Sequence, residues 1–132
     1  MDYSLALMRA EKLRLVLVED DVDLALVTQA ALELEGLEVD VAHDGRAGLT
    51  LIDRVHPDVV VTDLIMPIVD GLQLIRQLMA RQGPPVIAIS AVGSRLHAAR
   101  ELGAVEALVK PVDPGELAAC ARKVFRNAVA AH

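Results

Sequence analysis

Aromatic residues are nearly absent from this chain, which has one Phe, one Tyr and no Trp among its 132 residues. Hydrophobic residues nevertheless make up 54% of it, so any core must be built from aliphatic side chains. A chain of this length buries about two-thirds of its unfolded surface, which is enough for one self-sufficient domain. The single Cys excludes an internal disulfide and suits a reducing compartment, so a cytoplasmic protein is expected.

Basic clusters and long apolar runs are also missing. The net charge is −6, with 13 basic residues against 19 acidic ones, whereas nucleic-acid binding needs a basic face. No apolar run approaches the roughly 20 residues that a membrane span requires. No glycine-rich phosphate loop follows the first apolar run, and no His/Cys spacing suits zinc. We therefore expect no direct nucleic-acid partner, no membrane partner and no nucleotide site.

Short apolar runs alternate with longer amphipathic segments from residue 13 onward. The pattern predicts strands near 13–18, 37–42, 58–62, 85–89 and 105–109, and helices near 22–35, 45–55, 71–82, 94–102 and 114–130. Such alternation is typical of an α/β fold, in which a doubly wound parallel sheet lies between helix layers. Residues 1–12 are expected to form an N-terminal leader, and residues 13–130 a single domain.

Several local signals support these boundaries. The helix over 22–35 carries Leu24, Val27, Ala31 and Leu34 on one stripe, which is expected to face the core. Gly36 is a plausible stop for that helix. Asp113 before Pro114 is a good start for the last helix, because Asp favours the N-cap and Pro the first helical position.

Charged and polar residues follow four of the predicted strands. Glu19 and Asp20 come just after the first strand, Asp63 follows the third, Ser90 the fourth and Lys110 the fifth. In a doubly wound sheet the carboxyl ends of parallel strands share one edge, where ligands bind. Each of these residues alone is more often a turn, cap or solvated residue, but their joint occurrence at strand ends points to a shared site.

The chemistry of such a site follows from its charges. Carboxylates crowded into one crevice repel, and a hard divalent cation with oxygen ligands relieves the repulsion. Mg²⁺ takes one or two carboxylates together with water and a phosphate oxygen. Asp63 would then be placed as a nucleophile toward phosphorus, because carboxylates can form aspartyl-phosphate intermediates. Lys110 would supply a positive charge, and Ser90 a hydroxyl donor.

Six segments carry a resemblance to a known family. They are Val-Leu-Val-Glu-Asp-Asp (16–21), Pro-Asp-Val-Val-Val-Thr-Asp-Leu-Ile-Met-Pro (57–67), Asp70-Gly71, Ile89-Ser90-Ala91, Leu102-Gly103-Ala104 and Val109-Lys110-Pro111. On these segments the chain resembles the receiver domain of bacterial two-component response regulators over roughly residues 13–130. The resemblance implies a flavodoxin-like three-layer sandwich, with a five-stranded parallel sheet in the order 2-1-3-4-5 flanked by five helices.

The resemblance also implies roles for individual residues. Asp63 resembles the phospho-acceptor, Lys110 the phosphate-pairing lysine and Ser90 the switch hydroxyl. The Mg²⁺ ligands implied are Glu19, Asp20, Asp63 and the backbone carbonyl of Ile65. The implied function is to accept a phosphoryl group from a histidine kinase or histidine phosphotransfer protein, and to signal to a downstream protein through altered contacts.

The chain departs from the family at four positions. Ala107 stands where a switch aromatic would follow the hydroxyl inward, and Val112 replaces the aromatic common after Lys-Pro. Ile65 and Val92 occupy the positions that flank the path of the attacking water, and both are apolar, which predicts slow self-hydrolysis of the phosphoryl group. The bond between Lys110 and Pro111 is expected to be cis, as is common in the family.

Other functions stay open at this point. A metal-dependent phosphohydrolase of the dehalogenase-like kind would carry a second Asp at the position of Ile65, so catalysis on an external substrate is not expected. The missing aromatic at Ala107 keeps open a phosphorylation-independent docking module. A homodimer could also form through the face made by residues 94–102, 105–109 and 114–130.

Overall fold

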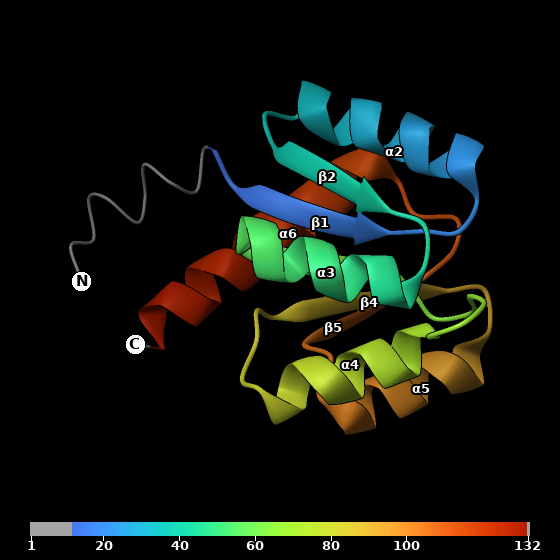
Figure 1. The fold of residues 1–132 in the computed structure, drawn as a ribbon. Coiled ribbons are helices and arrows are strands. Elements are labelled where there is room, and N and C mark those ends of the chain that lie inside the picture. The colour runs from blue at the N-terminus through green and yellow to red at the C-terminus, as the bar shows by residue number, and fades with distance from the viewer. Residues whose placement is uncertain (1–11, 132) are drawn as a thin grey trace.

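A five-stranded parallel sheet forms the centre of the structure, and helices lie on both of its faces (Figure 1). The computed structural model describes residues 12–131, so the predicted leader lies outside the described residues except for Lys12. The strands are β1 (Arg14–Val18), β2 (Glu38–Ala42), β3 (Val59–Asp63), β4 (Val86–Ser90) and β5 (Glu106–Val109). Their order is β2-β1-β3-β4-β5, which confirms the fold class and the strand order that the resemblance implied.

Within the described residues, five helices connect and flank these strands. They are α2 (Val22–Leu34), α3 (Gly45–Val55), α4 (Gly71–Ala80), α5 (Gly93–Leu102) and α6 (Pro114–Ala130), labelled as in Figure 1. The predicted ends agree to within two residues because the local signals are strong. The Asp113 carboxylate accepts the N–H of Glu116 at 3.0 Å, and Gly36 takes a positive φ of 91° just after α2.

The sheet separates two aliphatic cores. One face packs against α2 and α6, and Phe125 is the one aromatic side chain in this core among the residues that the structure describes. The opposite face packs against α3, α4 and α5. The β3 strand is buried at every position, as its continuous β-branched sequence predicted for a strand covered on both faces. Within residues 12–131, none of the helices combines the length and the apolar character that a membrane crossing requires.

The predicted core face of α2 is wrong. Val27 is 68% exposed and Leu34 is 90% exposed, whereas Ala25 and Leu32 are the buried residues of this helix. The sequence of α2 is apolar on nearly all sides, so its periodicity could not decide which side meets the sheet. The helix turns Ala25 and Leu32 inward, and the Gln29 amide donates to the Val39 carbonyl at 2.9 Å. An apolar surface is thereby left on the outside of the helix.

Candidate functional site

The register of the sheet brings the polar strand ends together. Val18 at the end of β1 pairs with Thr62 of β3, so Glu19 emerges beside Asp63. Asp63 in turn pairs with Ile89 of β4, and Ser90 pairs with Val109, the residue before Lys110. The ends of four strands therefore contribute side chains to one place at the carboxyl edge of the sheet.

Lys110 links two carboxylates in this place. Its Nζ lies 2.7 Å from Asp63 Oδ2 and 3.0 Å from Glu19 Oε1. The lysine side chain is 24% exposed, whereas Glu19 and Asp63 are buried. The peptide bond between Lys110 and Pro111 is cis, as the resemblance implied. One ammonium thus sits between two buried acids, and the site of three carboxylates and one lysine retains an excess of negative charge.

Backbone groups fix the two carboxylates in position. The N–H of Ile65 donates to Asp63 Oδ1 at 3.1 Å, and the N–H of Asp21 donates to Glu19 Oε2 at 3.2 Å. Both oxygens of each carboxylate are therefore engaged. The structure places the backbone of Ile65 beside Asp63, while its side chain is 51% exposed. The role of its carbonyl as a metal ligand stays a prediction.

Burial and neighbouring charges shift the pKa values of Glu19 and Lys110. Burial raises the pKa of the Glu19 carboxyl, and the hydrogen bonds from Lys110 and from the Asp21 N–H counteract this only in part. For Lys110, burial acts to lower the pKa, but the hydrogen bonds to Asp63 and Glu19 outweigh it and leave the pKa raised. The ammonium therefore stays charged at neutral pH, whereas the ionised form of Glu19 is held at a cost.

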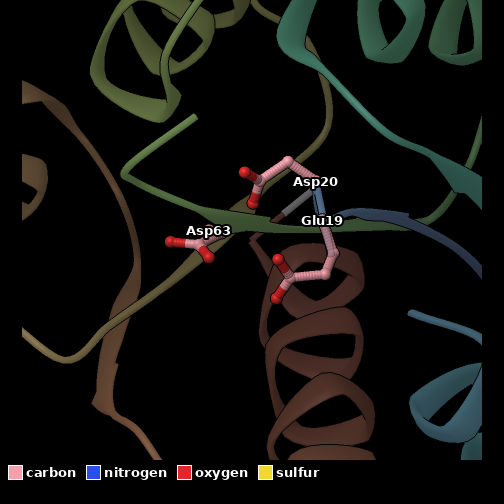
Figure 2. A group of neighbouring side chains, drawn as sticks. All are labelled: Glu19, Asp20 and Asp63. Carbon is pink, nitrogen blue, oxygen red and sulfur yellow. The ribbon is translucent and has the colours of Figure 1, made fainter. Parts of the chain in front are cut away.

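Asp20 completes an acidic cluster with the other two acids. One carboxylate oxygen from each of Glu19, Asp20 and Asp63 lies within 4.8 Å of the others. Figure 2 shows the three carboxylates converging on a common space. The donor set is made of hard oxygen atoms with no sulfur or imidazole, and Asp20 is open to solvent. Such a set fits Mg²⁺, which binds through a few carboxylates and keeps part of its water shell.

Ser90 lies on the neighbouring strand. It is 1% exposed, and its Oγ accepts the N–H of Val92 at 3.1 Å. Ala107, which pairs with Ala88, is half-buried against the α5 side of the sheet. A methyl group thus occupies the position where the family would place a ring. Ser90 belongs to the same edge as Asp63, although no hydrogen bond joins the two side chains.

Three supporting residues were missed by the sequence analysis. His43 Nδ1 lies 3.1 Å from the Glu19 carbonyl oxygen, and Thr62 Oγ1 donates to the Asp63 carbonyl at 2.8 Å. Gly71 packs so closely that a Cβ there would lie 2.3 Å from the Asp63 carbonyl oxygen. His43 and Thr62 lie beside the ends of strands β2 and β3, which is the signal that could have found them. Gly71 appears in the sequence analysis only within the Asp70-Gly71 segment.

A cavity of about 400 Å³ opens next to Lys110 between α2 and α6. Its walls are mostly apolar and include Leu17, Leu24 and Val112, with Glu19 and Lys110 at one end. A larger side chain at residue 112, such as the aromatic of the family, would reach into this space. Val112 is one of the residues that line this space.

Comparison with known proteins decides the family. The family model "Response regulator receiver domain" matches residues 15–122 of the chain. The chain belongs to this family. Receiver domains of this family bind Mg²⁺ at an acidic pocket, and this chain has an acidic cluster formed by Glu19, Asp20 and Asp63.

Relatives of this receiver domain include proteins named as transcriptional regulators. It is 37% identical over 116 residues to the transcriptional regulatory protein CpxR of Escherichia coli strain K12, which covers 86% of this chain and 50% of that protein. It is 33% identical over 122 residues to the probable transcriptional regulator ycf27 of Cyanophora paradoxa, which covers 91% of this chain and 51% of that protein. The chain thus spans about half the length of these curated relatives.

Solved structures agree with the family. The receiver domain of the Francisella response regulator 1452 superposes with a TM-score of 0.83 at 28% identity, covering 89% of this chain and 99% of that one. The beryllofluoride-activated receiver domain of Klebsiella pneumoniae RstA superposes with a TM-score of 0.80 at 28% identity, covering 86% of this chain and 98% of that one. The chain is therefore a receiver domain of the two-component response regulator type.

Proposed function

We propose that this receiver accepts a phosphoryl group on Asp63 from the phosphohistidine of a histidine kinase or histidine phosphotransfer protein. The observation that carries the proposal is the contact of Lys110 Nζ with Asp63 Oδ2 at 2.7 Å, beside two further carboxylates. A lysine and a cation-binding acid cluster around one buried aspartate suit phosphoryl transfer, which depends on positioning and on charge neutralisation.

The transfer itself makes one bond and breaks another. An Asp63 carboxylate oxygen attacks phosphorus, the P–N bond of the phosphohistidine breaks, and the electron pair returns to the imidazole, which takes up a proton. The product is an acyl phosphate. Mg²⁺ held by Glu19, Asp20, Asp63 and the Ile65 carbonyl would supply positive charge to the phosphoryl oxygens. Lys110 pairs with the same oxygens, and Ser90 donates its hydroxyl to one of them.

We further propose that the phosphorylated receiver signals through protein contacts. The outer side of α2 exposes Val22, Leu26 and Val27 by 51%, 57% and 68%, and this apolar surface supports a protein partner. Val105 and Val109 are 47% and 62% exposed beside β5, which supports a homodimer through residues 94–102, 105–109 and 114–130. The net charge of −6 supports the expectation of no direct nucleic-acid contact. A cytoplasmic location stays a prediction.

We propose that the domain is regulatory and turns over no external substrate. The side chain of Ile65 offers no general acid near Asp63, which supports this part of the proposal. A phosphorylation-independent docking module is a second candidate, and the specific observation that favours it is the methyl side chain of Ala107 at the usual switch position. The two candidates differ in whether Asp63 is modified at all.

One experiment separates these functions. The protein is incubated with Mg²⁺ and acetyl phosphate, or with beryllofluoride, and the adduct on Asp63 is followed by intact mass and by fluorine NMR. A stable adduct that is lost in Asp63→Asn and without Mg²⁺ is the expected result. Steady phosphate release without an adduct would point to a hydrolase, and no reaction at all would point to the docking module. Asp53→Asn, at an exposed aspartate paired with Arg81 away from the site, is the matched control.

A further inference from the structure

One edge of the sheet is open along β2. Among the described strands, β2 pairs with β1 alone (Figure 1). The Glu38 N–H donates to the Leu13 carbonyl at 2.9 Å, and the Ala42 carbonyl accepts the N–H of the residue after β1, also at 2.9 Å. Alternate residues of a strand direct their backbone groups to opposite sides. The N–H and C=O groups of Val39 and Val41 therefore point away from β1, to the open side.

The α2 helix covers one of these open groups. The Gln29 amide donates to the Val39 carbonyl at 2.9 Å, as the N–H of a further strand would. The backbone groups of Val41 have no such cover among the described residues. Val22 and Leu26 precede Gln29 by seven and three residues, so they lie on the same stripe of α2, and they are 51% and 57% exposed. An apolar surface thus continues beside the open edge.

The two faces of β2 carry different side chains. Val39 and Val41 pack with the core on the side of α2 and α6. Because side chains alternate along a strand, Asp40 lies on the opposite face, with α3. Asp40 is half-buried, and it has no ion-pair partner within residues 12–131. The other acid of the strand, Glu38, lies 3.5 Å from Arg14. The middle of the edge therefore carries an uncompensated negative charge.

The charge of Asp40 decides against a second copy of this chain as the occupant of the edge. Antiparallel pairing of two β2 strands about Asp40 would use the open groups of Val39 and Val41 in both copies. It would also place two Asp40 carboxylates directly opposite each other, and like charges in that arrangement are destabilising. The edge is thereby protected from pairing with itself and favours a strand that brings a cation to this position.

We propose that the β2 edge binds an extended peptide of another protein, in which a Lys or Arg stands between two apolar residues. The peptide adds an antiparallel strand to the sheet. Its basic side chain pairs with Asp40, on the side of a cavity of about 450 Å³ in whose wall the charges of Asp44 and Arg54 offset each other. Its apolar side chains pack on the other face, beside Val22 and Leu26.

The test is an NMR titration of the receiver with the peptide acetyl-Thr-Val-Lys-Val-Thr-amide. Mg²⁺ is present, so that the acidic cluster at Asp63 does not hold the basic peptide. We expect the amide signals of Val39 and Val41 to shift and their hydrogen exchange to slow, because their N–H groups gain acceptors. The same peptide with Glu in place of Lys should bind about ten-fold more weakly, because it puts like charges opposite each other.

Three variants show whether the contact is the one proposed. Asp40→Lys should reverse the preference, so that the Glu peptide binds better than the Lys peptide. Asp40→Asn, a milder change, should reduce the difference between the two peptides to less than about three-fold. Gln29→Ala should bind the Lys peptide about five-fold more tightly, because no amide has to be displaced from the edge.

The matched control is Glu101→Lys, which makes the same change of net charge on α5, in the helix layer on the opposite face of the sheet. It should leave the preference for the Lys peptide unchanged. Equal binding of the two peptides to wild type, or shifts confined to amides away from β2, would overturn the inference. Slower exchange at Val39 and Val41 that grows with protein concentration without peptide would also overturn it, because a second copy would then occupy the edge. The proposed function stands in each case, since Asp63 takes no part in this contact.

Discussion

Replacement of Lys110 by methionine tests the electrostatic balance of the site most directly. The change removes an ammonium that lies 2.7 Å from one buried carboxylate and 3.0 Å from another, and keeps most of the apolar stem. At an effective dielectric constant of 20, one ion pair at 2.7 Å is attractive by about 6 kcal/mol. Asp63 and Glu19 are left facing each other without their shared counter-charge.

The expected net cost is smaller than this attraction. Burial of the Lys110 ammonium costs hydration energy, which offsets part of the attraction to the carboxylates. The lysine side chain is also 24% exposed, so water partly screens the ion pair. Removing one partner from a fully buried pair costs 3–5 kcal/mol, so about 2 kcal/mol is expected here. For a domain of this size that corresponds to a fall in Tm of roughly 6–10 °C.

The pH dependence follows from Glu19. Its pKa is already raised by burial, and loss of the ammonium should raise it further. The folded variant then holds a proton that the unfolded chain releases above the ordinary value of 4.5. A group of this kind weakens folding as pH rises through its folded pKa, so the deficit should shrink as pH falls from 7 toward 4.5.

These expectations are checked by thermal unfolding of wild type and Lys110→Met at pH 7 and pH 5. Each measurement is made with and without about 10 mM Mg²⁺. Mg²⁺ should narrow the gap between the two proteins, because the cation replaces the lost positive charge. Lys123→Met is the matched control, since Lys123 is 65% exposed and lies 3.8 Å from Glu106. It should stay within about 0.5 kcal/mol of wild type. Equal Tm values for wild type and Lys110→Met without Mg²⁺ would refute the reasoning.

Three further predictions concern neighbouring positions. The phosphoryl group on Asp63 should persist for many minutes, and Ile65→Asn should shorten its lifetime because the amide can orient water. Phosphate release measures this lifetime, and loss of the group from wild type within seconds would contradict the prediction. Gly71→Ala should destabilise by more than about 2 kcal/mol in urea unfolding because its Cβ would lie 2.3 Å from the Asp63 carbonyl oxygen, whereas Gly93→Ala, in open space, should not. Val112→Phe should fill the cavity near Lys110 and raise stability by about 1 kcal/mol; a lower Tm would show that the cavity cannot admit a ring.

Most of the architecture could be predicted because local and long-range signals agree. The β-branched run at Val59–Val61 is a strand covered on both faces, and Asp113 with Pro114 marks the start of α6. The meeting of Asp63 with Lys110 also followed from the sequence, since parallel strands end at a common edge. These conclusions depend only on the direction of each strand and on which segments are buried. The local residue pattern predicts both.

What could not be predicted depends on choices that the local pattern leaves open. The α2 helix has apolar residues on almost every side, so packing against β2 and α6, and not periodicity, decides that Leu32 is buried and Leu34 exposed. The bond between Ser90 and the Val92 N–H is another case, because a serine after a strand has several partners within reach. The same holds for His43 and the Glu19 carbonyl, which come from separate loops.

The division of the core by the sheet has a consequence for how such a molecule can be used. α2 belongs to one helix layer with α6, and α5 belongs to the opposite layer with α3 and α4. A protein bound along α2 would leave α5 uncovered, because the five-stranded sheet separates the two helix layers. Substitutions on the outer side of one helix layer therefore need not disturb a contact made by the other layer.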